Sequence, residues 1–584
     1  MRPRTAIRLR LFLRHFARSE QVVLVLLAVV VGIAAGYGAL AFRLAAGAVQ
    51  WLGFGVSGDT LIGAIEALPP WRVILVPTAG GLIVGLFLWR FLPGGRPHGI
   101  PHIIEAATLD NGRMPVRAGI VTAVAHAASV GVGASTGREG PVVHLGAFLA
   151  SWAARRLRLD RGASRTLLGC GAAAATGALF NAPMAGVLFA LELVIGHHAL
   201  RAAAPVVVAA VAGTAIGRYY FGPAPAFAVP ALHHVSFWEF PAFLLLGLAS
   251  AVAAGIFMRA ILAAEAVAAR SRLPVWLRPA VAGLGVGLLA LWLPQLPGAG
   301  YEATDTALHG AYGLDLYLIL IVAKIVATAL CLGFGFGGGV FGPALTVGAM
   351  VGGAFGTIAG SAFPDLFSGI SAYALIGMAA VGGAVLGVPL TTIFIVFELT
   401  GSSAMTIAVM VATVIASLST RALVGRSIFH LQLARRGVMI DGADEAGALR
   451  AVTVADVMHR GYVTVAPDAD LATLRERVAR SPEGEAFVVD AGGRFAGVVS
   501  WRDLLAADGR PDATAGALAR AGTVVLLAGD TLSTAIDAVR GEGDRTLPVL
   551  HDRADMKLAG AVREADLLRA WNRALRRARE EAAG

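Results

Sequence analysis

The stretch Ser135–Pro141 places two ionisable side chains, Arg138 and Glu139, in a segment that is otherwise almost wholly apolar. An ionisable side chain at membrane depth costs ~2.5–3.5 kcal/mol on insertion scales, so it usually lines a pathway or a buried pair. The flanking glycines allow a tight turn, and the apolar run that follows is typical of a helix whose positive end points at that turn. This pattern predicts an anion site in which Glu139 takes the place of an anion. The alternative is an Arg138–Glu139 pair that only holds a buried turn.

The composition indicates that these residues lie in a membrane. Of the 584 residues, 57% are hydrophobic and 15% are charged, which is typical of a polytopic membrane protein. The formal net charge is +10, and six arginines between Arg2 and Arg18 directly precede the first apolar run, Gln21–Gly47. By the positive-inside rule this arrangement predicts a cytoplasmic N-terminus and not a nucleic-acid partner. The run is too long for a signal peptide. Cys170 and Cys331 predict neither a disulfide framework nor a metal cluster.

The elements that must position the site are apolar segments between about residues 21 and 424. Some, such as Phe237–Ile261, are long enough to cross a bilayer. Many others, such as 142–155, 184–196 and 343–359, are short and broken by Gly or Pro. Short broken segments in corresponding positions of two halves indicate a transporter site near the bilayer midplane.

Two such halves are visible in the sequence. A Gly-Pro pair recurs at an offset of 202 residues (343 − 141), and a proline and a glutamate recur at an offset of 206 (389 − 183). Glycine alone would recur by chance in a chain with 73 glycines, so the proline and glutamate carry the inference. The sequence leaves open whether the halves are parallel or inverted. The recurring positions are Gly140, Pro141, Pro183 and Glu192, then Gly342, Pro343, Pro389 and Glu398.

The C-terminal part changes character after the last apolar segment. Two stretches of mixed helix and strand pattern each end in an Asp-Leu-Leu motif, at Asp503 and Asp566, which are 63 residues apart (566 − 503). This spacing predicts a tandem pair of α/β units. The predicted organisation is a basic N-terminus at 1–20, a membrane domain at 21–432 with repeats at about 72–220 and 278–424, a linker at 433–451, and α/β units at 452–508 and 509–575.

Taken together, these motifs resemble those of the CLC family of chloride channels and chloride/proton antiporters, followed by a pair of CBS domains. Members of that family build the anion path from three loop–helix junctions. The matching stretches here are Pro97-His98-Gly99-Ile100-Pro101, Gly137-Arg138-Glu139-Gly140-Pro141 and Gly338-Gly339-Val340-Phe341-Gly342-Pro343. The resemblance covers nearly the whole chain.

The resemblance implies an all-α polytopic membrane protein, built as an inverted repeat of broken helices, with a cytoplasmic α/β pair of CBS domains. It implies a homodimer in the plasma (inner) membrane, with both termini cytoplasmic, that transports chloride or a similar anion and is not an enzyme. It assigns Glu139 the role of gate, and it implies no metal and no cofactor other than chloride as ligand. The implied anion-binding residues are His98, Gly99, Ile100, Gly137, Arg138, Gly140, Val340, Phe341 and Phe429.

Two departures from the family pattern concern the anion. His98 stands where the family has a serine; either its ring donates a hydrogen bond to the anion, or it turns away and bonds a backbone carbonyl. Phe429 stands where the family has a tyrosine, so the inner mouth loses a hydroxyl donor. The neighbouring His430 would point elsewhere on a helix and is not predicted as a substitute.

A third departure concerns protons. Leu193 stands where many antiporters of the family carry a proton-passing glutamate, so a channel is favoured and chloride/proton exchange through Glu139 is the alternative. Glu192 and Glu398 are expected to cap or pair with buried backbone, and His144 to be a satisfied interior histidine. Lys324 either snorkels or raises the local positive potential, or it only packs near a helix end.

The CBS pair resembles domains that bind adenine nucleotides in some proteins. The family's ribose-binding pattern is complete in the first unit, where it includes Ser500 and Asp503, whereas Arg563 replaces a hydroxyl before Asp566 in the second. The alternative is a pair that only dimerises and adjusts gating. A CBS-regulated cation transporter is a remote alternative, because it would need several facing carboxylates at membrane depth.

Overall fold

The computed structural model describes residues 20–583 except 57, 59–60, 197–198, 231–235, 437, 439–451, 482, 508–509, 511, 521, 523 and 540–545. The chain divides into two compact units, Met1–Ile440 and Asp441–Gly584, which are described separately. Apart from Glu20, the predicted basic segment 1–20 lies outside the described residues, as does most of the predicted linker.

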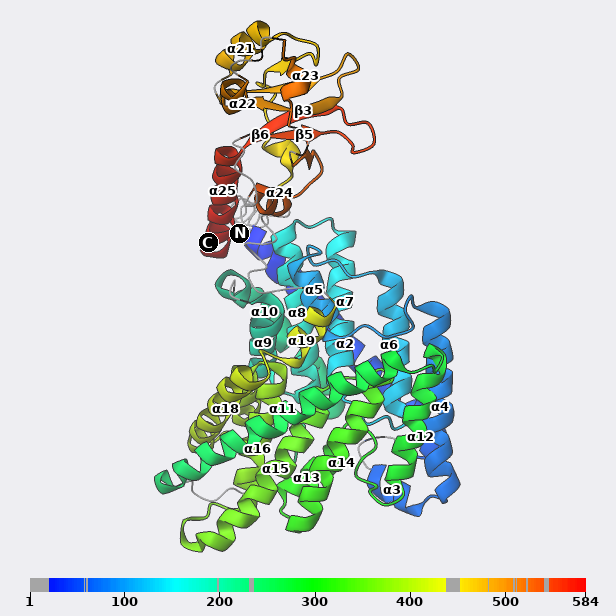
Figure 1. Cartoon of the computed structure of the whole chain (residues 1–584). Helices are drawn as coiled ribbons and strands as arrows, with labels where there is room; N and C mark the ends of the chain where they lie inside the picture. Colours follow the sequence, from blue (N-terminus) through cyan, green and yellow to red (C-terminus); the bar gives the residue numbers. More distant parts are fainter. Residues whose placement is uncertain are drawn as a thin grey trace, which may run out of the picture. The chain divides into compact units, whose positions relative to one another are not determined.

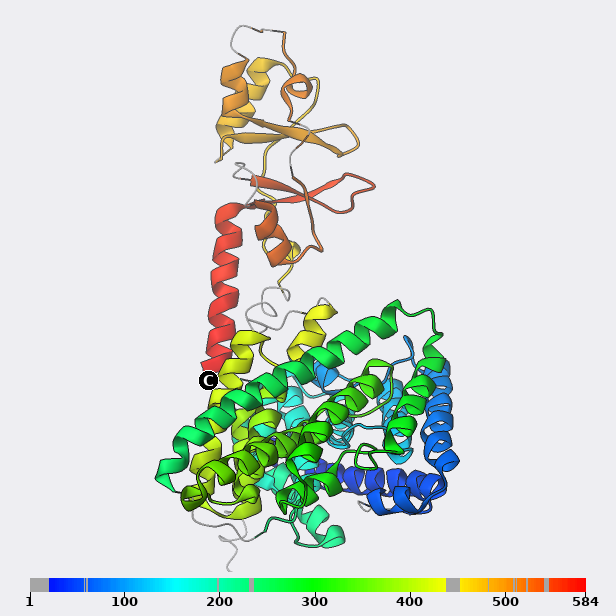
Figure 2. The same cartoon turned by 60° about the horizontal axis from the view of Figure 1, so that its bottom comes forward.

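The first unit is a bundle of helices (Figures 1 and 2). Seven of the described helices are long and apolar enough to cross a membrane, and five more apolar helices are shorter. Its helices are α2 (Glu20–Phe54), α3 (Leu61–Ala67), α4 (Pro70–Phe91), α5 (Ile100–Thr108), α6 (Val116–Gly131), α7 (Glu139–Arg156), α8 (Arg161–Phe180), α9 (Pro183–Phe189), the π-helix η1 (Ala190–Ile195), α10 (Ala199–Phe221), α11 (Phe240–Arg270), α12 (Arg278–Ala290), α13 (Tyr301–Leu308), α14 (Leu314–Gly333), α15 (Phe341–Ala362), α16 (Ile370–Leu386), α17 (Pro389–Thr400), α18 (Ser403–Leu423) and α19 (Ile428–Arg435).

Helix α15 is longer than the sequence analysis expected, because the predicted short segment 343–359 continues to Ala362. Glycine disfavours a helix interior when nothing packs against it. In α15, the glycines allow neighbouring helices to pack closer than any larger residue would permit. A Cβ on Gly352 would lie 2.1 Å from the backbone oxygen of Tyr373 on α16, and one on Gly353 would lie 2.5 Å from the ring of Tyr317 on α14.

The two halves of the bundle meet where their broken helices begin. The backbone N–H of Gly137 donates to the carbonyl of Gly339, and the N–H of Gly339 donates back to Gly137, both at 2.7 Å. The two segments therefore pair antiparallel, and residues at the 202-residue offset exchange identical bonds. Such reciprocity is what a twofold relation between two halves produces, and it agrees with the inverted repeat.

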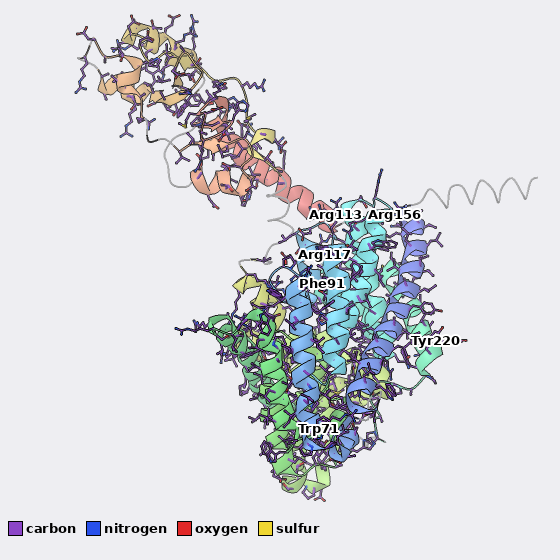
Figure 3. All side chains as sticks on the ribbon, turned by 90° about the vertical axis from the view of Figure 1, so that its right-hand side faces the viewer. Trp71, Phe91, Arg113, Arg117, Arg156 and Tyr220 are labelled. Atoms are coloured by element: carbon purple, nitrogen blue, oxygen red, sulfur yellow. The ribbon has the colours of Figure 1, made fainter. Side chains whose placement is uncertain are left out.

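Figure 3 shows where three arginines lie relative to the two ends of α4. Trp71 lies at one end of α4, and Phe91 lies toward the other end, where Arg113, Arg117 and Arg156 gather. The positive-inside rule predicts that this arginine-rich end is the cytoplasmic one. Large apolar side chains cover much of the outer surface of the bundle, as a lipid-facing surface requires. Leu26, Val30, Leu44, Ile83, Val322 and Leu418 are among the exposed ones.

The second unit contains two small sheets of the same topology. In each, the first strand pairs parallel with the second, and the second pairs antiparallel with the third. A cluster of buried side chains that includes Phe487, Phe495 and Leu550 joins the two sheets. The elements are β1 (Thr464–Val465), α21 (Leu471–Arg480), β2 (Glu485–Val489), β3 (Phe495–Ser500), α22 (Trp501–Ala506), α23 (Ala515–Leu518), β4 (Leu526–Leu527), α24 (Leu532–Val539), β5 (Thr546–Leu550), β6 (Leu558–Arg563) and α25 (Glu564–Ala583).

Candidate functional site

Glu139 is the first residue of α7, and its side chain is buried. Its Oε1 accepts a hydrogen bond from the hydroxyl of Tyr301 at 2.7 Å, and its Oε2 accepts one from the backbone N–H of Gly342 at 3.0 Å. Gly342 lies in the first turn of α15. The carboxylate of one half therefore occupies the helix N-terminus of the other half, which is where an anion binds.

Glycine at two positions makes room for this carboxylate. A Cβ on Gly137 would lie 2.1 Å from Oε2 of Glu139, and a Cβ on Gly342 would lie 2.8 Å from Oε1. Neither distance is compatible with a side chain at these positions while the carboxylate stays in place. Both glycines are therefore needed for the observed position of Glu139.

Tyr301 was not identified by the sequence analysis. It is the first residue of α13 and follows Gly300, whose φ of +91° is a left-handed conformation that favours glycine. The guanidinium of Arg138 lies over the Tyr301 ring, 4.1 Å from its centroid, a cation–π contact that helps to fix the ring. In the sequence, the only indication of this role is a single tyrosine that follows a glycine, and this pattern alone does not predict a contact with Glu139.

Lys324 supports the loop that leads to Tyr301. Its Nζ donates to the backbone carbonyls of Leu296 at 2.8 Å and Gly298 at 2.9 Å, and the residue is buried. A snorkelling lysine would reach water, so the expectation of snorkelling is wrong. The side chain instead donates two hydrogen bonds to the loop that precedes Tyr301, the hydrogen-bond partner of Glu139.

A cavity of about 100 Å³ lies between α19 and Gly140, the sequence neighbour of Glu139. Its wall brings together six of the nine predicted anion-binding residues from four separate stretches of chain. As residues at the start of α15, Val340 and Phe341 have backbone N–H groups without a carbonyl partner one turn earlier in the helix. The six wall residues are His98, Gly99, Ile100, Gly140, Val340 and Phe429.

The other three predicted residues lie elsewhere. Gly137 pairs with Gly339, and the Phe341 ring packs between Phe180 and Phe189. Arg138 lines a second cavity of about 90 Å³ together with Tyr301.

Glu139 lines neither cavity, although its sequence neighbours Arg138 and Gly140 line one each. The cavity at Arg138 is also lined by Leu61, shortly before α4 begins, whereas the other is lined by Arg96, shortly after α4 ends. Because α4 is long enough to span a bilayer, the two cavities approach Glu139 from opposite sides. We call the cavity at Arg96 the inner cavity and the cavity at Arg138 the outer cavity.

Phe429 contributes its ring to the wall of the inner cavity and is buried. It lies in the first turn of α19, whose N-cap is Ser427. The Nδ1 atom of His430 lies 2.8 Å from the Ser427 hydroxyl oxygen, so the ring of His430 is engaged at the cap. This agrees with the expectation that His430 does not replace the missing hydroxyl.

Four histidines lie together beside the inner cavity. The His98 ring stacks on His102 with centroids 4.0 Å apart, and the His144 ring lies 6.3 Å from both His98 and His126. No hydrogen bond from the His98 ring to a backbone carbonyl is found in the described part of the chain. His144 is fully buried, and neither of its ring nitrogens has a hydrogen-bond partner there. The expectation that His144 is satisfied is therefore wrong, and such burial costs about 1–3 kcal/mol for each group.

Glu192 and Glu398 cap helices of the opposite half, as expected. Glu192 accepts hydrogen bonds from the backbone N–H groups of Leu390 and Thr391, at 3.0 and 2.8 Å. Glu398 accepts from Met184 and Ala185, both at 2.9 Å. Leu193 is buried next to Glu192 in the π-helix η1, and no proton role follows from an aliphatic side chain.

The predicted nucleotide residues of the CBS pair are engaged with one another. Asp503 accepts hydrogen bonds from the backbone N–H and the hydroxyl of Ser500, at 2.8 and 2.7 Å, and lies 3.3 Å from Nε of Arg520. Arg563 donates to Asp566 and to Glu483, which lies in the first of the two predicted α/β units. Within the described residues, no group of three or more His, Cys, Asp or Glu side chains is arranged to hold a metal ion.

The sequence of the chain is similar to those of known protein families and proteins. The family model described as "Voltage gated chloride channel" matches residues 80–421, and the CBS domain model matches residues 454–510. The chain is 36% identical over 409 residues to a putative chloride channel protein ClcB-like from Ralstonia nicotianae, covering 69% of this chain and 95% of that protein. It is 31% identical over 414 residues to the voltage-gated ClC-type chloride channel ClcB of Escherichia coli, covering 70% and 98%.

Solved structures share the fold. A CLC-type fluoride/proton antiporter superposes with a TM-score of 0.60 at 25% identity and covers 71% of this chain and 98% of its own. A eukaryotic CLC transporter superposes with a TM-score of 0.62 at 18% identity and covers 93% and 97%. A slow cyanobacterial Cl⁻/H⁺ antiporter gives a TM-score of 0.63 at 24% identity, covering 71% and 97%.

Proposed function

The chain belongs to the CLC family of anion transport proteins, with CBS domains in its C-terminal part, and we propose that it moves chloride past Glu139, whose carboxylate is the gate. The observation that carries this proposal is the bond from Gly342 N–H to Glu139. A carboxylate at a helix N-terminus competes with a mobile anion for the same N–H groups. The pathway is blocked while Glu139 is ionised and in place.

Protonation of Glu139 opens the pathway in this proposal. A neutral carboxylic acid loses most of its attraction for the positive end of α15, and a chloride ion then takes its place. The wall of the inner cavity offers helix N-termini to that ion, and backbone dipoles hold it weakly enough to let it leave. Chloride is the proposed anion because two relatives are chloride channel proteins.

Chloride efflux from liposomes tests the gate. The protein is reconstituted with internal chloride, and efflux is followed with a chloride electrode at external pH values from about 3.5 to about 8, which extend from below the ordinary pKa of a glutamate carboxylate to well above it. Wild-type efflux rises as the pH falls, whereas Glu139→Gln efflux is fast and independent of pH, because the amide cannot ionise. Glu66→Gln, at an exposed position on α3, is the matched control. An unchanged pH dependence in Glu139→Gln would sink the proposal.

A second candidate function is chloride/proton exchange, in which the proton taken up by Glu139 also crosses the membrane. The likeness to a fluoride/proton antiporter favours it, and Leu193 speaks against it because it cannot accept a proton. The buried histidines beside the inner cavity offer protonatable groups elsewhere, which weakens the argument from Leu193. Proton movement driven uphill by a chloride gradient distinguishes exchange from conduction.

We also propose that the protein works as a homodimer in the plasma (inner) membrane, with both termini cytoplasmic. The arginine-rich end of the bundle supports this orientation (Figure 3). The CBS pair is proposed as a regulatory unit that takes an adenine nucleotide at Ser500 and Asp503. The support for this proposal is the ribose-binding pattern, which is complete in the first α/β unit of the pair.

A further inference from the structure

The strongest unassigned feature of the membrane unit is the set of histidines at the inner cavity. They come from three elements: the loop before α5 carries His98, α6 carries His126 and α7 carries His144. Their rings form a connected group, with His144 at 6.3 Å from each of the other two. His98 and His126 line the inner cavity, and Gly140, next to Glu139 in sequence, lines it as well.

The tautomer of His126 follows from its partner. Its Nε2 lies 2.8 Å from the backbone carbonyl oxygen of His98, and a carbonyl oxygen only accepts hydrogen bonds. Nε2 therefore carries the hydrogen in the neutral ring, and Nδ1 holds the lone pair. That Nδ1 is buried and has no hydrogen-bond partner among the described residues. It is an unpaired proton acceptor at the wall of the cavity.

His144 is the complementary group. It is fully buried, and both of its ring nitrogens lack a partner in the described part of the chain. A neutral imidazole offers one N–H donor and one acceptor, so His144 can take a proton at one nitrogen and give one up at the other. His144 also lies on the helix that Glu139 begins.

His102 behaves differently and is not part of this group. Its Nδ1 accepts from the backbone N–H of Gly99 at 3.1 Å, and its Nε2 lies 2.9 Å from Nη1 of Arg436. A guanidinium only donates hydrogen bonds, so hydrogen donors face both nitrogens. The neutral ring has a single lone pair, which faces a donor at whichever nitrogen holds it, so His102 has no free site for a proton; its ring stacks on that of His98.

Other charged groups surround the cluster. The inner cavity is also lined by Arg96, by Glu265 of α11 and by Arg436, the C-cap residue of α19. The Glu265 carboxylate accepts a hydrogen bond from Gln432. The two arginines make a positive charge unfavourable near the cavity mouth. A proton that reaches the histidines is therefore not trapped there, and an anion is drawn in.

We propose that His98, His126 and His144 form the inner proton station of this protein, which passes protons between Glu139 and the inner cavity and takes over the task for which Leu193 has no carboxyl group. This inference rests on the proposed gate function of Glu139. Once protonated, the carboxyl group leaves the N-terminus of α15 and gives its proton through cavity water to an imidazole lone pair. The imidazolium then gives up a proton to the next ring or to cavity water, from its other nitrogen at His144 and from the same Nδ1 at His126, whose Nε2–H stays bonded to the His98 carbonyl. Only N–H and O–H bonds form and break, and the carboxylate returns to its ionised state.

The test measures chloride and proton movement together. Proteoliposomes receive an outward chloride gradient with the voltage clamped by potassium and valinomycin, and electrodes follow external chloride and pH. The wild type moves protons uphill. His144→Gln and His126→Gln keep the hydrogen-bonding capacity but cannot be protonated, so proton movement falls about 100-fold, the usual effect of losing an acid–base group, while chloride efflux continues.

Two further variants make the result specific. His309→Gln, at an exposed histidine on the turn after α13, is the matched control and keeps wild-type proton movement. His144→Glu restores a protonatable group and recovers proton movement, which a merely structural role of His144 would not predict. If His144→Gln also loses chloride efflux, its proton movement cannot be interpreted. The ratio of protons to chloride in His126→Gln and His144→Glu then decides whether the histidines carry protons.

Three results would overturn the station. The first is wild-type protein that passes chloride with no uphill proton movement, which would leave the Glu139 gate intact. The second is a wild-type proton-to-chloride ratio in both glutamine variants. The third is a His144→Glu variant that carries chloride and no protons. Failure of the gate itself is seen separately, as unchanged pH dependence in Glu139→Gln.

Discussion

The carboxylate of Glu139 and the hydroxyl of Tyr301 form a 2.7 Å hydrogen bond between the first residues of two helices, α7 and α13. The hydroxyl donates, so the bond is strongest when the carboxylate is ionised. Together with the N–H of Gly342, Tyr301 holds the gate in the position that competes with an anion. In the proposed function, Tyr301 is therefore a latch that holds Glu139 in the closed state.

Removing the latch should open the pathway at neutral pH. Tyr301→Phe removes one hydrogen bond to a charged group, which is worth about 1.5–3 kcal/mol, so the open fraction rises about tenfold or more. Chloride efflux at pH 7.5 should increase accordingly, and its acid activation should shrink. Tyr317→Phe is the control, because that hydroxyl donates to the Ala307 carbonyl and not to Glu139. Equal efflux in wild type and Tyr301→Phe would show that the bond does not hold the gate.

Gly137→Ala tests the same position by steric exclusion. The added methyl carbon would lie 2.1 Å from Oε2 of Glu139, so the carboxylate must leave its place. Efflux should become fast and nearly independent of pH, as in Glu139→Gln. Gly63→Ala adds a methyl group with no atom within 4 Å and should behave as wild type. Folding is checked by size-exclusion chromatography, and a folded Gly137→Ala variant with normal acid activation would contradict the observed carboxylate position.

The loop–helix junctions could be predicted because each is a run of consecutive residues. Gly137 to Pro141 carries its turn, its carboxylate and its helix start within one short stretch. Tyr301 lies 162 residues from Glu139, and only tertiary packing brings the two together. The histidines were missed as a group for the same reason, since His98, His126 and His144 come from three elements.

The capping role of Glu192 could be predicted because it repeats in Glu398 at a fixed offset. The partners of Glu398, Met184 and Ala185, precede those of Glu192, Leu390 and Thr391, by the same 206 residues (390 − 184). The length of α15 could not be predicted, because its glycines disfavour a helix locally and are required by packing against Tyr373 and Tyr317.

Glu192→Gln and Glu398→Gln should lower stability to a similar extent. Each weakens a pair of charge-assisted bonds at a helix N-terminus, at a cost of about 1–3 kcal/mol, so Tm in detergent should fall by roughly 2–6 °C. Thermal unfolding is compared at one scan rate, with Glu66→Gln as the exposed control. Loss of proton movement with unchanged Tm in Glu192→Gln would show instead that Glu192 carries protons.

Phe429→Tyr should strengthen anion binding in the inner cavity. The ring lines the same wall as Val340, and a hydroxyl there adds a hydrogen bond to a charged ligand, worth about 1.5–3 kcal/mol. Calorimetric titration with chloride should show about tenfold tighter binding. Phe363→Tyr, at an exposed position after α15, should change nothing. Equal affinity in wild type and Phe429→Tyr would place the anion away from this ring.

Nucleotide binding by the CBS pair should depend on Asp503 and not on Arg563. The Asp503 carboxylate is oriented by Ser500, so it is prepared to accept ribose hydroxyl groups in exchange for its contact with Arg520. Arg563 already donates to Glu483 and Asp566. Because these two carboxylates largely compensate its charge, we expect its guanidinium to bind a phosphate only weakly.

Calorimetric titration of the full-length protein with ATP should therefore show binding that falls about tenfold or more in Asp503→Asn, the effect of losing a charged hydrogen-bond acceptor. Arg563→Ala should bind nearly as the wild type does, and Asp512→Asn, at an exposed position, is the matched control. Stronger loss in Arg563→Ala than in Asp503→Asn would reverse the assignment, because it would mean that the guanidinium leaves its two carboxylates to hold a phosphate. No heat of binding in the wild type would leave the pair as a purely structural unit, in which the ion pair between Arg563 and Glu483 joins the two α/β units.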